Sequence, residues 1–500
     1  MVGVRPGVRT AAGTAGAAAL ALSLPLLGAH DAQADANADA AVAAARWQAG
    51  EVGEDGGIPG FAGADWGLTV DTLMALKATG AEPDTATRIT DALKVHVRDY
   101  NSLDAWGEKG QRVAGATAKL LYAAVITKSD PEKFGAYNLR QETLDLIAGS
   151  DKGLEDGRVK DKVNAPSVDN SNTFGQSLAV LGLARSGGVP QNAVDFLIDQ
   201  QCSAGGFRLY PYAFGGSAVT GDCDAENGKA VIDPDSTGMA VHALIAAADA
   251  GVPGAQAAAD KGAKWLRQKQ AANGSFGGSG PTAAANTNST GLAGQALAAA
   301  GHQAEADKAA DWVAGHQLTE ANGGKAKAEA GAIAYNNDSL TSAQSDGIED
   351  FQRDQWRRAT PQALLALAQV PLGKIGETDP DPGPGPGDNG GTGDNGGAGD
   401  GGSGDNGGSG GGPDPSDSAT PGDAGGANPS GLPPSGHPSP ASVGGGTGGS
   451  TGGSGSGGGL AATGAAVLPW AAGSALLIGG GYVTYRTANR RKAGTEGTQA

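Results

Sequence analysis

The chain has 500 residues, a formal net charge of −18 and an aromatic content of 5%. The acidic balance excludes a nucleic-acid-binding protein, because such proteins present basic surfaces to the phosphates. Many of the 88 glycines lie toward the C-terminus, so the average composition understates how globular the rest of the chain is.

The N-terminus carries the pattern of a secretory signal peptide. Arg5 and Arg9 precede an apolar run at about 11–27, and Ala32-Gln33-Ala34 supplies the small-x-small pattern that a signal peptidase accepts. The alternative is a buried N-terminal helix, but the Ala/Asp-rich stretch that follows offers it nothing to pack on. We therefore expect residues 1–34 to direct secretion.

From 35 to 372 the sequence alternates between two kinds of helical segment. One kind is rich in Ala and Leu with little charge, which is typical of helices buried on all sides. The other kind is amphipathic and carries Lys, Arg and Asp, as outer helices do. The expected inner helices span 66–80, 110–128, 169–187, 233–251, 286–301 and 356–369; the expected outer helices span about 39–50, 84–100, 132–148, 191–201, 255–272 and 303–317.

Three of the inner helices begin alike. Each starts with Asp, Asn, Ser and Thr residues that can cap a helix, followed by an Ala/Leu-rich stretch. We take as their common register the threonines Thr173, Thr237 and Thr290. An open solenoid would need polar terminal repeats, which neither end shows clearly. The sequence thus predicts an all-α, closed (α/α)6 toroid of alternating inner and outer helices.

A second repeat combines an aromatic residue, a glutamine and a Gly-x-Phe sequence. It occurs at 196–207, 265–276 and 312–324, where the last copy lacks the final aromatic residue. The pattern resembles the Gln-Trp repeats of the terpene cyclase and prenyltransferase α/α-toroid superfamily, and the resemblance covers most of 43–372. It implies a structural role, in which the glutamine bonds orphan carbonyls at the helix end and the ring packs on the next repeat.

The segment Asp233-Pro234-Asp235-Ser236-Thr237 resembles the D-x-D-D-T-A motif of class II triterpene cyclases. In that family the middle aspartate, held protonated, starts cyclisation, and its place here is taken by Asp235. Ser236 replaces the family's last aspartate, few aromatic residues are present to line a cation cavity, and no sequence remains for a second helical domain. We expect Asp235 to be a cap or rim residue, and we keep catalysis on a lipid or glycan by Asp235 or Asp233 as the alternative.

Other catalytic sites find little support. Zinc prenyltransferases use a D-x-C spacing, whereas Asp222 and Cys223 are adjacent here, and Cys223 is expected to form a disulfide with Cys202 in an oxidising compartment. We predict no metal and no cofactor. A polysaccharide-cleaving toroid would need carboxylates from different helices, for which the candidates are Asp65, Asp169 and Asp233.

In such a toroid the outer-to-inner connections emerge at one end, which we call the mouth. The longest connection, 203–232, carries three aromatic residues within the predicted disulfide loop. Aromatic side chains on a tethered loop favour ligand contact, but they could equally cover the edge of the core. The candidate ligand-binding residues are Trp66, Asp169, Tyr210, Tyr212, Phe214, Asp233, Asp235, Asn286 and Asn288.

Non-catalytic exported toroids occur in the same superfamily, and the resemblance extends to the cobalamin carriers transcobalamin and intrinsic factor. Those carriers close their ligand under a second, β-rich domain, which does not follow here. A corrinoid-type ligand is therefore an analogy at the level of the fold. We expect a module that binds a small ligand or partner.

Residues 373–459 are rich in Gly, Ser, Pro, Asp and Asn without a hydrophobic period, which predicts a disordered stalk with an r.m.s. reach of ~50 Å. Leu460-Ala461-Ala462-Thr463-Gly464 follows, then an apolar stretch at 465–482 that is long enough to span a membrane, and then a basic tail.

This order resembles the sorting signal of sortase substrates, which are cleaved between Thr and Gly of an L-P-x-T-G motif. Ala461 replaces the proline, as in the L-A-x-T-G variant of actinobacteria. The resemblance implies a membrane-spanning precursor that sortase cleaves after Thr463 and attaches covalently to peptidoglycan at the cell surface. The alternative for 460–500 is a plain membrane anchor.

Overall fold

The computed structural model describes residues 24–60, 63–165, 167–212, 219–221, 223–226 and 230–377. The predicted stalk, the sorting motif Leu460, Ala461, Thr463 and Gly464, and the predicted membrane span lie outside these residues. Among the described helices, none is both long and apolar enough to cross a membrane.

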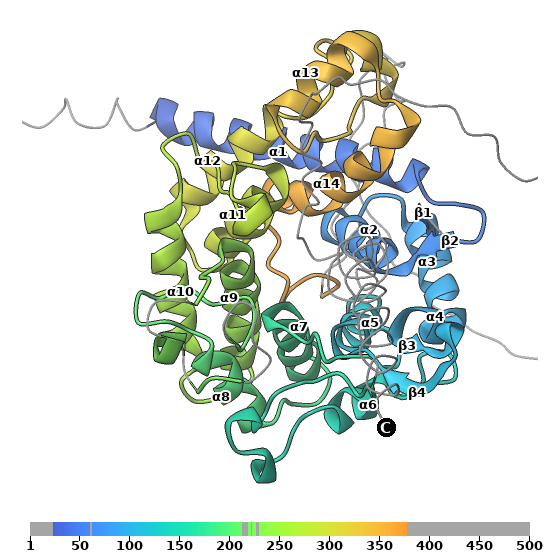
Figure 1. Ribbon diagram of the computed structural model, residues 1–500. Helices are drawn as coiled ribbons and strands as arrows, with labels where there is room; N and C mark the ends of the chain where they lie inside the picture. The colour runs from blue at the N-terminus through green and yellow to red at the C-terminus, as the bar shows by residue number, and fades with distance from the viewer. Residues whose placement is uncertain are drawn as a thin grey trace, which may run out of the picture. The chain divides into compact units, whose positions relative to one another are not determined.

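Six helices form a closed inner ring (Figure 1). Each packs on the next in chain order, and the last packs on the first. These helices are α2 (Trp66–Thr79), α5 (Ala114–Ile126), α7 (Thr173–Ala184), α9 (Pro234–Asp249), α11 (Thr287–Ala299) and α14 (Asp350–Ala368). Because α14 contacts α2 directly, the predicted closed toroid of inner and outer helices is confirmed for this part of the chain.

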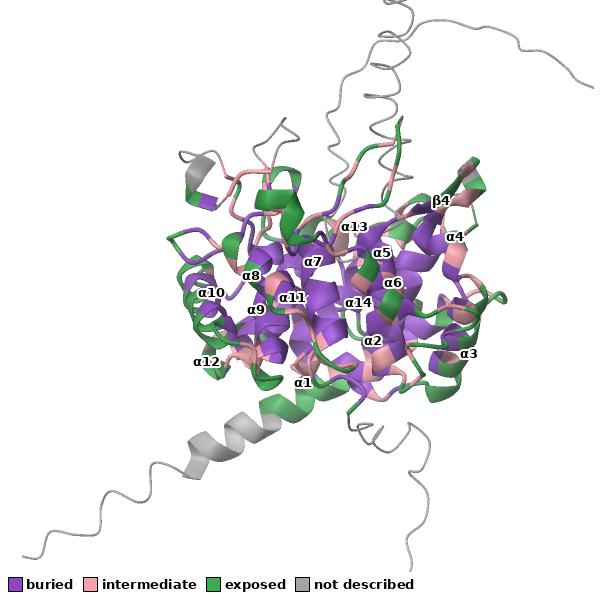
Figure 2. Cartoon of the chain, turned by 90° about the horizontal axis from the view of Figure 1, so that it is seen from below, coloured by how far each residue is buried: buried purple, intermediate pink, exposed green. Residues whose placement is uncertain are grey.

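Six further helices surround the ring, each against one or two inner helices. They are α1 (Leu24–Gly50), α3 (Pro83–Val95), α6 (Leu139–Asp145), α8 (Gln191–Asp199), α10 (Ala255–Lys269) and α12 (Gln303–Ala314). Figure 2 shows the inner helices almost wholly buried and the outer helices exposed on one side. The core residues run from Ala41 to Ile375, so residues 35–377 contain the whole hydrophobic core of the ring.

Shorter elements fill the connections. Between α3 and α5 the chain forms α4 (Val97–Asn101) and a small antiparallel pair, and a second pair precedes α2; α13 (Asn337–Asp346) lies between α12 and α14. The strands are β1 (Ile58–Gly60), β2 (Gly63–Asp65), β3 (Ser102–Leu103) and β4 (Glu108–Arg112). Two predicted helices are therefore shorter than expected, because β4 takes the start of the segment 110–128 and α6 covers only the middle of 132–148.

The threonine register is wrong for α7. The residue that caps each helix is Asn172 for α7, Asp233 for α9 and Asn286 for α11. Thr237 and Thr290 follow their caps by four residues and accept a backbone N–H from the preceding loop, at 2.9 Å in both cases. In α7 the residue four places after the cap is Gln176, whose side chain accepts the equivalent N–H of Val159 at 2.8 Å.

The repeated glutamines tie the outer layer together. Each side-chain amide donates one hydrogen bond to a glycine carbonyl of its own loop and one to the next outer helix, so the predicted bonds to orphan carbonyls of its own helix end are wrong. The donors are Gln201, Gln270 and Gln317, and their acceptors on the next outer helix are Ala258, Glu305 and Ala40. Since Ala40 belongs to α1, the third of these bonds closes the outer layer.

The third copy of the repeat contains an insertion. The glycine that matches Gly205 and Gly274 is Gly331, which has a positive φ of 103° and packs against the carbonyl of Ala43 in α1. Ile333 takes the place of the phenylalanine in this copy. Its N–H donates to the Thr360 hydroxyl, as the N–H groups of Phe207 and Phe276 donate to the hydroxyls of Thr237 and Thr290 in the other copies. The glycines at 323–324, expected to match, belong to the insertion.

The end of the described chain fills the ring opposite the mouth. Leu372 and Ile375 are both 0% exposed. Tyr122 of α5 donates to the Leu372 carbonyl at 2.8 Å, and Arg185 at the end of α7 donates to the carbonyls of Leu372 and Ile375. Since Ile126 and Arg185 mark the C-terminal ends of inner helices, residues 370–377 close that end.

Candidate functional site

The mouth is the end of the ring at which four inner helices begin with a side-chain cap. Each capping side chain accepts an N–H of the first turn of its helix. The caps are Asp65 for α2, Asn172 for α7, Asp233 for α9 and Asn286 for α11. Asp169, predicted at the same position as Asp233, instead lies in the preceding loop, where it accepts the N–H of Ser171. The mouth therefore carries caps from separate repeats, whereas Asp169 is a loop residue.

Asp235 is the most perturbed residue of the mouth. It is 2% exposed, and its Oδ1 atom is buried without a hydrogen-bond partner. Burial, aided by the neighbouring Asp233 carboxylate, raises the pKa of Asp235 well above its ordinary value, and nearby Ser289 opposes this only in part. Burial therefore favours the protonated form of Asp235, and the capping role that was one expectation for it belongs to Asp233.

Asp233 is held in place by two hydrogen bonds. Its Oδ1 atom accepts the N–H of Ser236 at 2.7 Å, and its Oδ2 atom accepts the hydroxyl of Ser279 at 2.5 Å. Both acceptors of this carboxylate are thus engaged by the protein. The two aspartates of the motif have different environments, which is how one fold can hold one carboxyl neutral and another hydrogen-bonded.

A buried polar chain crosses the ring next to the mouth. Asn288 of α11 donates to Gln362 of α14 at 2.6 Å, and Gln362 approaches Asp71 of α2 at 3.5 Å. Asp71 forms an ion pair of 2.6 Å with Lys119 of α5, and both side chains are at most 1% exposed. Burial raises the pKa of Asp71 and lowers that of Lys119, while their mutual attraction opposes both shifts.

Asp71, Lys119 and Gln362 were not among the predicted site residues. Their signal was a charged or amide side chain in the middle of an otherwise apolar helix, a position where such residues are rare unless they are paired. Asn288 was predicted, and it is the residue that joins this chain to the mouth.

Two tyrosines of the long connection stack on one another. The ring centroids of Tyr210 and Tyr212 are 5.2 Å apart, and Tyr210 is 39% exposed. Burial and the Asp233 carboxylate raise the pKa of Tyr210, whereas Asn172 lowers it by hydrogen bonding; burial is the main cause that raises the pKa of Tyr212 to about 12. The two tyrosines therefore lie beside the acidic side of the mouth, while Phe214 lies outside the described residues.

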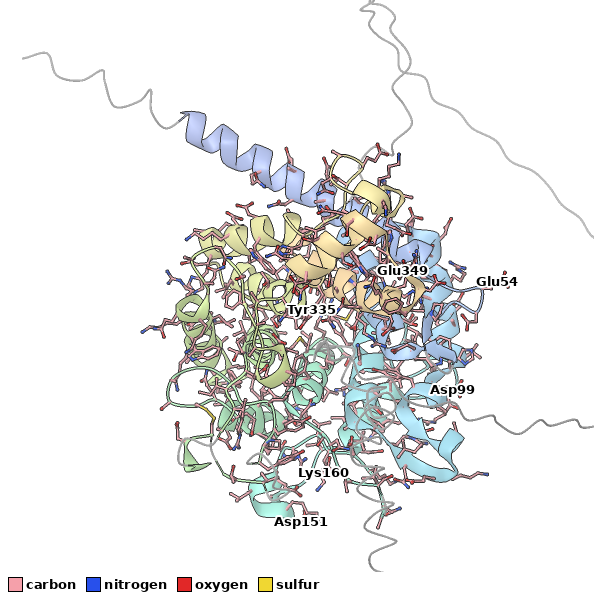
Figure 3. The ribbon with its side chains drawn as sticks, turned by 45° about the horizontal axis from the view of Figure 1, so that its top comes forward. Glu54, Asp99, Asp151, Lys160, Tyr335 and Glu349 are labelled. Atoms are coloured by element: carbon pink, nitrogen blue, oxygen red, sulfur yellow. A yellow bond between two sulfur atoms is a disulfide. The ribbon has the colours of Figure 1, made fainter. Side chains whose placement is uncertain are left out.

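The neighbouring loop brings Asp169 to the same side. Asp169 forms an ion pair of 3.0 Å with the buried Arg158, and its charge acts on Tyr212. Asp161 accepts the N–H of Ala114 at 2.8 Å and so caps α5 from outside its own sequence. Burial raises the pKa of Asp161 to about 6. In Figure 3, Asp151 and Lys160 of this loop lie toward the edge of the domain and Tyr335 lies toward its middle.

Trp66 does not join this cluster. It is 8% exposed and stacks on His96, with ring centroids 4.2 Å apart. Asp65, at the same helix start, binds Arg358 at 2.8 Å.

His242 lies two turns below Asp235 on α9, and burial lowers its pKa to about 3, so it is a neutral core residue.

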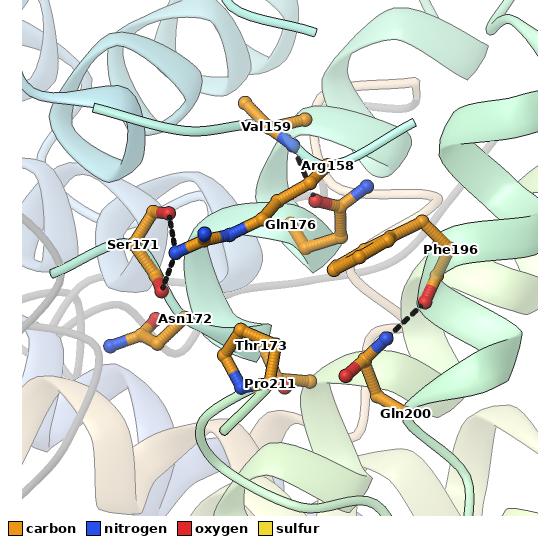
Figure 4. Close-up of a pocket in the computed structure, with 9 residues that line it drawn as sticks. All are labelled: Arg158, Val159, Ser171, Asn172, Thr173, Gln176, Phe196, Gln200 and Pro211. Atoms are coloured by element: carbon orange, nitrogen blue, oxygen red, sulfur yellow. Dashed lines mark hydrogen bonds between the residues drawn. The ribbon is translucent and has the colours of Figure 1, made fainter. Parts of the chain in front are cut away.

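Two cavities among the described residues differ in size and place. Figure 4 shows a small one of about 10 Å³, with room for one water molecule, between Arg158, Ser171 and Pro211. A larger one of about 360 Å³ lies at the start of α6, toward the opposite end, beside Asn138 and Ser186. Neither of these two cavities is lined by Asp235, which is 2% exposed.

The predicted disulfide is present, between Cys202 and Cys223. Within the described residues, no three His, Cys, Asp or Glu side chains come together in a way that could hold a metal ion.

No protein family model matches the chain, and no curated protein matches its sequence. Solved structures are similar in fold. A protein from Actinoplanes is 17% identical with a TM-score of 0.43, over 67% of this chain and 99% of its own.

An inactive α-1,6-mannanase variant of Salegentibacter, solved with α-1,6-mannotriose, is 13% identical with a TM-score of 0.43, over 66% of this chain and 99% of its own. A type II terpene cyclase of Scytonema, solved with geranylgeranyl dihydroxybenzoate, is 15% identical with a TM-score of 0.41, over 69% of this chain and 99% of its own. At these values the likenesses give no information about activity, and the toroid rests on the contacts of this chain.

Proposed function

We propose that the chain is a surface protein, attached to peptidoglycan by sortase, whose toroid binds a small ligand at the mouth. The observation that carries the binding site is the stacked, partly exposed pair Tyr210 and Tyr212 beside the carboxylates of Asp169 and Asp233. Aromatic faces with a few polar groups at a concave site are the usual composition of small-ligand sites. The disulfide between Cys202 and Cys223 tethers the loop that carries both rings.

The binding proposal can be tested with residues 35–377, exposed to spent culture medium and examined by native mass spectrometry and absorbance. We expect a retained small molecule, and a coloured one would indicate a corrinoid. Tyr210→Ala and Tyr212→Ala should each lose it, whereas Tyr137→Ala, which removes a half-buried tyrosine outside this loop, should keep it. Retention by all three variants would place the ligand elsewhere.

The anchoring proposal is supported by the order of motif, apolar stretch and basic tail in 460–500. A Thr463→Ala variant should stay in the membrane fraction instead of being released with wall fragments. Ala462→Ser changes the variable position of the motif and should leave release unchanged. Wall release of the Thr463→Ala variant would contradict processing by sortase.

A second candidate is a surface enzyme that uses Asp235 as a general acid on a glycan or lipid. The raised pKa of the buried Asp235 beside Asp233 favours it, because a carboxyl that keeps its proton to higher pH can act as a general acid. Burial and Asp235 raise the pKa of Tyr335, so one aromatic side chain lies near this acid, whereas terpene chemistry needs several aromatic faces around the carbocation. Turnover that Asp235→Asn abolishes while ligand retention persists would establish the enzyme.

A further inference from the structure

The segment that covers Asp235 is short and nearly free of apolar anchors. It is the connection of residues 277–285 between α10 and α11, and most of its residues beyond Ser279 are exposed. A Cβ atom added to Gly278 would lie 3.0 Å from Asp235 Oδ2 and 3.3 Å from Ser289 Oγ, so the backbone of this segment rests directly on the two polar groups. Segments with few buried apolar contacts open more easily than the elements around them.

One hydrogen bond links this segment to α9. Ser279 donates its hydroxyl to Asp233 Oδ2, as described above. The other bonds stay within the segment or join it to the start of α11: Gly278 donates to the Thr282 carbonyl at 2.8 Å, and Asn286 donates to the carbonyls of Thr282 and Ala284. Loss of the Ser279 bond would free the α9 side while the α11 side stays attached, which is the geometry of a hinge.

Two polar atoms at the start of α9 lack partners. Asp235 Oδ1 and Ser236 Oγ are buried without a hydrogen-bond partner, while Ser289 faces the Asp235 carboxyl from α11. Most buried polar groups in proteins are paired, so two unpaired atoms on adjacent residues require an explanation. A ligand that reached them would supply the missing partners.

We propose that residues 277–285 are a lid, latched by the bond from Ser279 to Asp233, over a buried hydrogen-bonding site formed by Asp235, Ser236 and Ser289. The site takes an uncharged oxygen, as in a hydroxyl or carbonyl group. A neutral carboxyl and two hydroxyls can all donate to such an atom, and the N-termini of α9 and α11 disfavour a cation there. The lid deepens the proposed function by giving the mouth ligand a polar anchor, but its opening can be measured without that ligand.

Carbodiimide labelling with glycine ethyl ester tests the lid, because the reagent modifies carboxyl groups that solvent can reach. Peptide mapping of residues 35–377 at pH 6 should show slow labelling of Asp235 relative to the exposed Asp260. We expect Ser279→Ala to raise the Asp235 rate about tenfold, since a hydrogen bond to a charged group is lost. Gly278→Ala should raise it at least as much, because its new methyl group would crowd Thr282 Oγ1 within the segment and Asp235 Oδ2 beneath it.

The matched control is Ser167→Ala, which removes a hydroxyl-to-carboxylate bond of 2.6 Å to Glu108 in another connection. It should leave the labelling of Asp235 unchanged. Unchanged labelling in both lid variants, or an equal rise in the control, would overturn the lid. Either result would leave the proposed binding at Tyr210 and Tyr212 intact, so the two proposals fail separately.

The ligand class has its own probe. In the Gly278→Ala protein, glycerol should slow the labelling of Asp235 several-fold, whereas tetramethylammonium at the same concentration should not. Protection by the cation and none by glycerol would refute the assignment of an uncharged oxygen.

Discussion

Replacement of Asp235 by asparagine should change how stability depends on pH. The pKa of Asp235 is raised above its ordinary value of 3.8 in the folded protein, so the folded state keeps a proton that the unfolded state releases. Stability from this group is complete below the unfolded pKa and is lost as the pH rises toward the folded one, at about 1.4 kcal/mol per pH unit. An amide side chain cannot titrate in this range, so the Asp235→Asn protein should lack this decline.

The measurement is urea unfolding of residues 35–377, followed by tryptophan fluorescence, at intervals from pH 4 to 7.5. The free energy of unfolding of the wild type minus that of Asp235→Asn should fall by about 1.4 kcal/mol per pH unit from about pH 4 upward, until the folded-state pKa is reached. Asp161, whose pKa is raised to about 6, changes stability in the same direction but equally in both proteins, so it cancels. The exposed Asp260→Asn control should run parallel to the wild type. Parallel curves for Asp235→Asn would show that Asp235 is ionised in the fold.

Three further changes test the ring by urea unfolding. Lys119→Met should lower the free energy of unfolding by about 3–5 kcal/mol, because it leaves Asp71 buried without its cation. The double variant with Asp71→Leu should recover most of that loss, and no recovery would mean that the pair does not act as a unit. Removal of the disulfide by Cys202→Ala with Cys223→Ala should lower the free energy of unfolding by about 3 kcal/mol, because the bond closes a loop with a sequence separation of 21. An unchanged urea midpoint would contradict this. Gly291→Ala should cost about 1–3 kcal/mol, since its Cβ would collide with the Gln362 carbonyl of α14; a neutral effect would mean that the two helices separate freely.

The ring could be predicted because its signal is repeated. Each repeat buries one helix on all sides, so composition alone separates inner from outer helices, and the capping chemistry of Asp233 and Asn286 lies where the pattern indicates. The register failed where two residue types fill the same role, since Gln176 accepts a loop N–H as Thr237 does, and a nearby Thr173 obscured the match. An alignment of letters cannot detect that equivalence, because it belongs to the hydrogen bond.

The site could be predicted only in outline, since its chemistry depends on contacts between repeats. Asp235 was expected at a helix start, but its raised pKa results from burial, to which Gly278 of the connection after α10 contributes. The ion pair of Asp71 and Lys119 joins two separate inner helices, and no local pattern connects them. The insertion before Gly331 likewise displaced a repeat glycine beyond the spacing of the other copies.

The two ends of the ring differ in a way that decides how a ligand can enter. At the end opposite the mouth, Leu372 and Ile375 are fully buried, and Tyr122 and Arg185 hold their backbone carbonyls. At the mouth, Asp235 is covered by a connection that one serine hydroxyl joins to α9. Displacing residues 370–377 would expose buried apolar side chains. Displacing the lid would instead expose polar groups that lack partners. Water or a ligand oxygen therefore offsets the cost of opening at the mouth alone, which makes the lid the route to Asp235.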